Sequence, residues 1–137
     1  MPTGYSQTPL AKKLGIKAGF TIRLINAPAY YFELFTDMPD DIKQLDDKRV
    51  KKDLIHFFTV SSVELNRLLP ALKKEITPNG VIWVSWPKKA AKVSADVTEN
   101  MIRDLALSIG LVDLKVCAVD EIWSGLKLVI PVKDRVG

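Results

Sequence analysis

A cluster of lysines directly follows an apolar, strand-like segment near the middle of the chain. Residues 81–87 are rich in β-branched and aromatic side chains, and Lys88 and Lys89 come immediately after them. Ser61 and Ser62 stand at the predicted start of a helix, where free N–H groups favour a negatively charged ligand. Ammonium groups beside such donors bind phosphate or carboxylate. These residue types therefore predict an anion-binding site where the two segments meet.

The remaining candidate ligand-binding residues also lie where predicted strands end. In an open, mostly parallel sheet, ligands bind at the carboxyl ends of the strands, where successive connections diverge. No recognisable pair of catalytic groups stands at these positions, so we expect ligand-binding residues and no catalytic residue. The candidate residues are Asn26, Ser61, Ser62, Lys88, Lys89, Trp123 and Ser124.

Metal and thiol chemistry have little support in the sequence. With one cysteine, Cys117, and one histidine, His56, the chain forms no intrachain disulfide and no Cys/His zinc set, so no metal site is predicted. His56 lies inside an apolar segment, and Cys117 alternates with apolar neighbours in a predicted strand. Both are interpreted as structural, buried residues.

The composition is that of a globular chain. Its 137 residues are 47% hydrophobic and 26% charged, which suits one domain spanning residues 1–137, with residues 1–8 as a flexible N-terminal segment. The N-terminus lacks the apolar core of a signal peptide, and no apolar segment approaches the ~18 residues of a membrane helix. We therefore expect a cytoplasmic protein without a membrane partner.

The charge balance favours anionic partners. Twenty Lys and Arg residues against sixteen Asp and Glu residues give a formal net charge of +4, which attracts anions over long distances. An anionic small molecule is the expected partner. Nucleic acid is a second candidate, although no nucleic-acid-binding motif is present, and an oligomer is a third.

Strand-like and helix-like segments alternate along the chain. The apolar patterns predict strands at residues 20–26, 42–45, 53–60, 81–86, 114–119 and 126–132, and helices at 9–14, 28–35, 61–76 and 96–109. Capping-box patterns mark 61–64 and 96–99, and residues 77–80 have the composition of a turn. This order predicts a three-layer, Rossmann-like α/β sandwich with a six-stranded sheet that ends in an antiparallel hairpin.

Two resemblances refine this architecture. Residues 72–85, Leu-Lys-Lys-Glu-Ile-Thr-Pro-Asn-Gly-Val-Ile-Trp-Val-Ser, resemble the helix, turn and strand before the terminal hairpin of S-adenosylmethionine-dependent methyltransferases. That analogy implies the strand order 2-1-3-4-6-5. Residues 14–17, 24–28, 86–89 and 110–126 resemble a bacterial family of small proteins classed only as a domain of unknown function, which implies a Rossmann-like fold and no functional residues.

The turn after the first predicted strand argues against a nucleotide-type cofactor. Such cofactors lie over a glycine-rich turn with free N–H groups, whereas this chain has Asn26-Ala27-Pro28, in which proline also removes a donor. We therefore predict no cofactor, and S-adenosylmethionine in particular is not expected. The predicted function is that of a non-catalytic module that binds an anion at the ends of its strands. This prediction favours a chain that is not an enzyme. An unusual or degenerate methyltransferase-like enzyme and a homodimeric scaffold are the alternatives.

Overall fold

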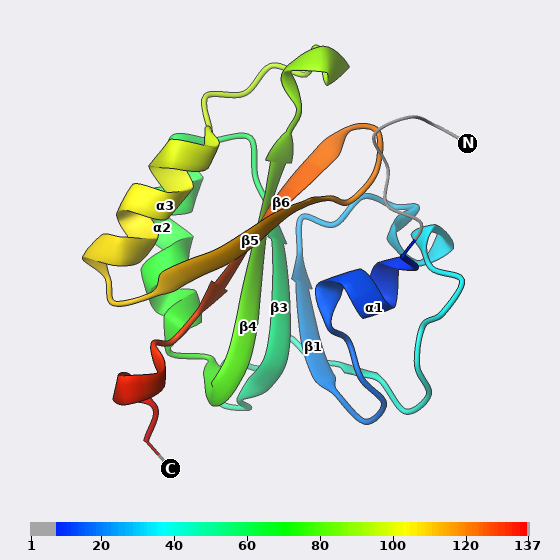
Figure 1. Cartoon of the computed structure of the whole chain (residues 1–137), viewed down its shortest axis with the longest axis vertical. Coiled ribbons are helices and arrows are strands. Elements are labelled where there is room, and N and C mark those ends of the chain that lie inside the picture. Colours follow the sequence, from blue (N-terminus) through cyan, green and yellow to red (C-terminus); the bar gives the residue numbers. More distant parts are fainter. Residues whose placement is uncertain (1–7, 137) are drawn as a thin grey trace.

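The computed structural model describes residues 8–136 of the chain (Figure 1). The flexible N-terminal segment predicted for residues 1–8 therefore lies outside the described residues, except for Thr8. Within the described range, no helix is both long enough and apolar enough to cross a membrane.

One six-stranded mixed sheet organises the molecule, with the strand order β2-β1-β3-β4-β6-β5. Strands β2, β1, β3 and β4 pair in parallel, and β6 pairs antiparallel with both β4 and β5. The predicted strand order, the Rossmann-like α/β class and the antiparallel terminal hairpin are therefore confirmed. The strands are β1 (Thr21–Ile25), β2 (Lys43–Gln44), β3 (Lys52–Phe58), β4 (Ile76–Pro87), β5 (Val112–Ala118) and β6 (Trp123–Val129).

Helices cover the two faces of this sheet unequally. Figure 1 shows α2 and α3 on one side and the short α1 on the other. The helices are α1 (Leu10–Leu14), α2 (Ser62–Lys73) and α3 (Glu99–Ser108), and three 3₁₀ segments are η1 (Tyr31–Leu34), η2 (Lys89–Ala91) and η3 (Val132–Asp134).

Strand β3 lies between two apolar clusters. Leu54 packs with α1, whereas Ile55 and Phe57 pack with α2 and α3, and all three side chains are fully buried. A strand that is apolar on both faces is typical of a parallel sheet covered by helices. The pattern of residues 53–60 thus predicts this central position correctly.

The helix predicted for residues 28–35 is wrong. The chain forms only the 3₁₀ segment η1, in which Tyr31 is the buried residue and Phe32 is 50% exposed. A helix that buries a single side chain gains little from packing, and helices are stabilised mainly by a buried apolar face. The many apolar residues of this segment therefore do not produce a helix.

The turn predicted for residues 77–80 lies within β4. Lys52 pairs with Ile76 and Leu54 pairs with Val81, so β4 carries extra residues at this point and the register shifts. At Gly80, an added Cβ would lie 2.7 Å from the Cβ of Ile76 and clash with it, and glycine, which has no Cβ, avoids this clash. The turn-forming residues therefore make a bulge in a continuous strand.

Candidate functional site

A pocket opens where β1 and β3 end and α2 begins. Its volume is about 390 Å³, which lies within the usual range of small-molecule pockets. It is lined by Asn26, Phe58, Thr59, Val60, Ser61, Glu64 and Trp123. We call it the strand-end pocket.

Asn26 makes the turn that leads from β1 into this pocket. Its φ of 57° lies in the left-handed region, which asparagine tolerates better than most residues. Its side-chain amide donates to the carbonyl of Phe58 and to Oε1 of Glu64, each at 3.0 Å. The tight turn after the first strand is therefore made without glycine.

Glu64 directs its carboxylate into the pocket from the first turn of α2. The Ser61 hydroxyl caps the helix by accepting from the Glu64 N–H at 3.2 Å, which confirms the predicted helix start. In a complete capping box the glutamate side chain would bind the Ser61 N–H. Instead Oε1 of Glu64 accepts from the Thr59 hydroxyl at 2.8 Å and from Asn26, while the Ser61 N–H donates to Thr59.

The charge of Glu64 has no cationic partner within residues 8–136. Both hydrogen bonds to its carboxylate reach Oε1, and no ion pair involves this side chain. The residues that line the pocket include no lysine or arginine. The strand-end pocket therefore presents a negative charge and is suited to a cation.

Aromatic rings form the other wall of the pocket. The rings of Phe58 and Trp123 meet edge to face, with centroids 5.1 Å apart. Asp120 holds the β5–β6 turn in place, because its carboxylate accepts from the Trp123 N–H at 2.7 Å and from the Tyr30 hydroxyl at 2.8 Å. Burial and the neighbouring Asp120 raise the pKa of Tyr30, so this hydroxyl remains a donor.

The structure brings three of the predicted site residues together, since Asn26, Ser61 and Trp123 all line the strand-end pocket. Ser62 begins α2, but its hydroxyl and N–H both donate to the Asp96 carboxylate at 2.7 Å. These hydrogen bonds lower the pKa of Asp96. The second predicted capping box is therefore wrong in detail: Asp96 binds the N-terminus of α2, and Thr98 caps α3.

The other predicted residues lie outside the lining of the pocket. Lys88 donates through Nζ to the carbonyl of Asp120 at 2.7 Å. Lys89 is exposed in η2, and Ser124 lies in β6, where it pairs with Trp86 and Ala118. Phe58, Thr59 and Glu64 line the pocket but were not among the residues predicted from the sequence. The polar Thr59 directly after an apolar strand was a usable signal, whereas the role of Glu64 was hidden because helix capping already explained it.

His56 is fully buried and is not itself a lining residue, but its ring stacks on that of the lining residue Phe58, with centroids 4.2 Å apart. Its Nδ1 is 3.0 Å from the Tyr31 hydroxyl, and its Nε2 is 2.8 Å from the Ser85 hydroxyl. Burial lowers its pKa to about 3, so the imidazole is neutral near pH 7. The interpretation of His56 as a hydrogen-bonded core residue agrees with these contacts.

Among the described residues, no group of three or more His, Cys, Asp or Glu side chains is arranged to hold a metal ion. No protein-family model matches the sequence, and no curated protein matches it significantly.

Solved structures nevertheless share the fold. A Methanococcus jannaschii fibrillarin pre-rRNA processing protein has a TM-score of 0.60 and 12% identity, covering 93% of this chain and 70% of that one. Magnesium protoporphyrin IX methyltransferase from Synechocystis, with bound S-adenosylhomocysteine, has a TM-score of 0.59 and 10% identity, covering 88% and 78%. The ribosomal protein L11 methylase of Lactobacillus delbrueckii subsp. bulgaricus has a TM-score of 0.56 and 13% identity, covering 85% and 72%.

These neighbours contradict three expectations from the sequence, namely a non-catalytic module, a chain that is not an enzyme, and the absence of a cofactor. The fold occurs in methyltransferases, and the Synechocystis enzyme was also solved with bound S-adenosylmethionine. The expectation from missing glycines is contradicted by the neighbours with bound S-adenosylhomocysteine or S-adenosylmethionine, and in this chain Asn26 makes the turn after β1 in the left-handed conformation. This chain therefore has the Rossmann-like fold of S-adenosylmethionine-dependent methyltransferases.

Proposed function

We propose that this chain is an unusual methyltransferase that binds S-adenosylmethionine in the strand-end pocket. The observation that carries the proposal is the Glu64 carboxylate, which faces this pocket without a cationic partner among the described residues. The pocket lies at the carboxyl ends of parallel strands, where α/β sheets bind their ligands.

The chemistry of the lining residues fits this cofactor. S-adenosylmethionine carries a sulfonium and an ammonium group, and either cation could pair with the free oxygen of Glu64. The partly exposed ring of Trp123 offers a π-face, on which a purine ring can stack and against which a cation is attracted, while the buried ring of Phe58 packs edge to face with it. The left-handed turn at Asn26 replaces the glycine-rich turn that such cofactors commonly meet.

When bound, S-adenosylmethionine supplies an electrophilic methyl group on a positively charged sulfur. The contribution of the chain is to hold and orient. Thr59 and Asn26 fix the Glu64 carboxylate by binding Oε1, and Oε2 would be the oxygen that pairs with the cofactor. The aromatic wall would exclude water, and a carboxylate in a drier site attracts a cation more strongly.

Isothermal titration with S-adenosylmethionine tests this proposal. Losing a charge-assisted contact costs on the order of 1.5–3 kcal/mol, so Glu64→Gln should weaken binding by roughly ten- to a hundredfold. The matched control is Glu33→Gln, which removes the same charge from an exposed residue of η1. No binding at millimolar concentration, or equal loss in both variants, would contradict the proposal.

Several expectations from the sequence remain part of this proposal. Membership of the small bacterial family and a cytoplasmic location rest on the resemblance of residues 14–17, 24–28, 86–89 and 110–126 and on the composition. Nucleic acid and a second copy of the chain remain proposed partners. Ser62, Lys88, Lys89 and Ser124 remain proposed ligand-binding residues around the strand-end pocket.

A further inference from the structure

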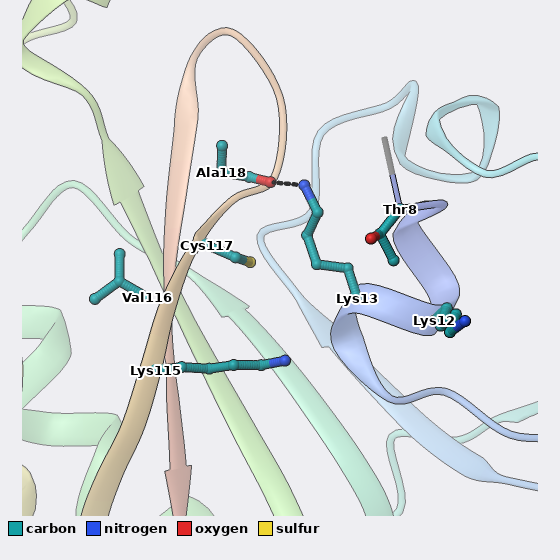
Figure 2. A pocket seen from close by; sticks show the side chains of 7 residues that line it. All are labelled: Thr8, Lys12, Lys13, Lys115, Val116, Cys117 and Ala118. Atoms are coloured by element: carbon teal, nitrogen blue, oxygen red, sulfur yellow. Dashed lines mark hydrogen bonds between the residues drawn. The ribbon is translucent and has the colours of Figure 1, made fainter. Parts of the chain in front are cut away.

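A second pocket lies between α1 and β5 (Figure 2). Its volume is about 460 Å³. It shares no lining residue with the strand-end pocket. Its lining residues are Thr8, Lys12, Lys13, Lys115, Val116, Cys117 and Ala118. We call it the lysine pocket.

The unequal cover of the sheet creates this hollow. Helix α1 packs over the middle of the sheet, where the indole N–H of Trp83 donates to the Leu14 carbonyl at 2.9 Å. Strand β5 is at the edge of the sheet, beyond α1. Figure 2 shows the side chains of Lys115 and Cys117 pointing toward α1, whereas Val116 points away. The helix thus forms one wall of the lysine pocket and β5 forms the other.

Three lysines from distant parts of the sequence line this pocket, and no acidic side chain is among its lining residues. Lys12 and Lys13 come from α1, and Lys115 comes from β5. Residues 1–7, which precede Thr8, contain no aspartate or glutamate. The nearby Asp37 carboxylate accepts from the N–H groups of Ala11 and Lys12, both at 3.0 Å, and so binds the N-terminus of α1.

Further lysines add to the positive charge on this face. Lys127 pairs with Lys115 across β5 and β6. Burial lowers the pKa of Lys127, and repulsion from Lys115 and Lys17 lowers it further. Burial raises the pKa of the Cys117 thiol, although the charges of Lys13, Lys115 and Lys88 act to lower it. Lys127 is therefore repelled by Lys115 and Lys17, and an anion bound beside Lys115 would offset that repulsion.

We propose that the lysine pocket binds the phosphate group of a small phosphorylated molecule. Lysine binds phosphate as a point charge, and several ammonium groups around one hollow match the multiple negative charge of a terminal phosphate. The hollow between α1 and β5 is open but measures only about 460 Å³, which suits a terminal phosphate better than the backbone of a long polymer. Because the two pockets share no lining residue, this inference does not depend on the methyltransferase proposal.

The test uses pyrophosphate as the probe and isothermal titration of the whole chain. Lys12→Gln with Lys115→Gln should weaken pyrophosphate binding tenfold or more. Lys13 is left unchanged because its Nζ donates to the Ala118 carbonyl at 3.0 Å and so ties α1 to β5. The matched control is Lys43→Gln with Lys48→Gln, which removes two exposed charges in β2 and the turn after it, at the opposite edge of the sheet, and should change affinity less than twofold.

Cys117 gives a second, independent readout. The prediction that Cys117 is buried is wrong, because its place in an edge strand beside the pocket leaves it partly exposed. Saturating pyrophosphate should therefore slow its alkylation by iodoacetamide in the native chain but not in the Lys12/Lys115 variant. The proposal is overturned if millimolar pyrophosphate does not bind, or if both double variants lose affinity equally. Binding of a short single-stranded RNA in the absence of pyrophosphate binding would also overturn it.

Discussion

His56 illustrates how one residue can determine the polarity of a buried region. A neutral imidazole has one donor and one acceptor, and here its two nitrogens meet the hydroxyls of Tyr31 and Ser85. All three side chains are buried. The hydroxyls can each donate or accept, so one donates to the neutral imidazole and the other accepts from it, and both lose this partner if the imidazole is removed.

The first residue-scale prediction concerns His56→Phe. This change leaves the Tyr31 and Ser85 hydroxyls without their partner, and each unsatisfied buried group costs about 1–3 kcal/mol. We expect the free energy of unfolding in urea to fall by about 2–6 kcal/mol. The control is the triple variant His56→Phe, Tyr31→Phe, Ser85→Ala, which removes all three polar groups and should cost less. A triple variant less stable than the single one would contradict this account.

The second residue-scale prediction concerns Glu75, which holds two cations. Both its oxygens accept from Arg23 at 2.8 Å, and Oε1 also accepts from the fully buried Lys52 at 3.1 Å. Removing one partner from a buried ion pair costs about 3–5 kcal/mol, so Glu75→Gln should destabilise the chain by that amount. Glu99→Gln, which breaks a more exposed pair with Arg103, should cost less than about 1 kcal/mol. Similar losses of stability in urea for the two variants would refute the role given to Glu75.

At the element scale, Asp96 joins the connection before α3 to the N-terminus of α2 through Ser62. Asp96→Ala should therefore speed amide hydrogen exchange in residues 88–97 and in the first turn of α2, with little change in β3. Asp104→Ala is the control, because it removes a carboxylate from the exposed side of α3. Unchanged exchange in both segments would show that this contact does not restrain the connection.

Some helices and strands could be predicted from the sequence, and others could not. Strand β3 and helix α2 were predictable because their apolar patterns match faces that are buried in the structure. The conformation of residues 28–35 was not predictable, because composition does not show how many of these side chains pack against the rest of the protein. In η1 only Tyr31 is buried. In β4, the turn chemistry of residues 77–80 was recognised, but the pairing with β3 turned it into a bulge.

Only part of the candidate site could be predicted from the sequence. Strand ends gave Asn26, Ser61 and Trp123, since the carboxyl ends of parallel strands meet at one edge. Glu64 was missed because its direction depends on the hydroxyl of Thr59 and the amide of Asn26, which come from other parts of the chain. Side-chain direction of this kind follows from tertiary contacts and not from local pattern.

At the scale of the whole molecule, the net charge of +4 conceals two opposite local fields. The strand-end pocket has an unpaired carboxylate among its described lining residues, and the lysine pocket has several ammonium groups. The fold separates them, because one pocket lies where strands end and the other lies beside an edge strand. A single formal charge therefore could not predict which pocket attracts which ligand.

The last prediction concerns the stability of the whole chain as a function of pH. The pKa of His56 is about 3 in the folded state, against 6.5 for an ordinary histidine, because burial disfavours the charged form. Between these values the unfolded chain binds a proton that the folded chain does not, so stability is fully present above the unfolded pKa and falls as the pH decreases. The slope expected from one proton is about 1.4 kcal/mol per pH unit.

Urea unfolding from about pH 7 down to about pH 4.5 measures this slope. In this window the stabilisation from Asp96 is nearly constant, because hydrogen bonds from Ser62 lower the pKa of that carboxyl from 3.8 and its contribution is lost mainly at more acidic pH. Both His56→Phe and the triple variant should lose the slope, since neither carries the buried imidazole. A native chain whose stability is constant across this window, or a triple variant that keeps the native slope, would show that the buried His56 does not control the acid response of the fold.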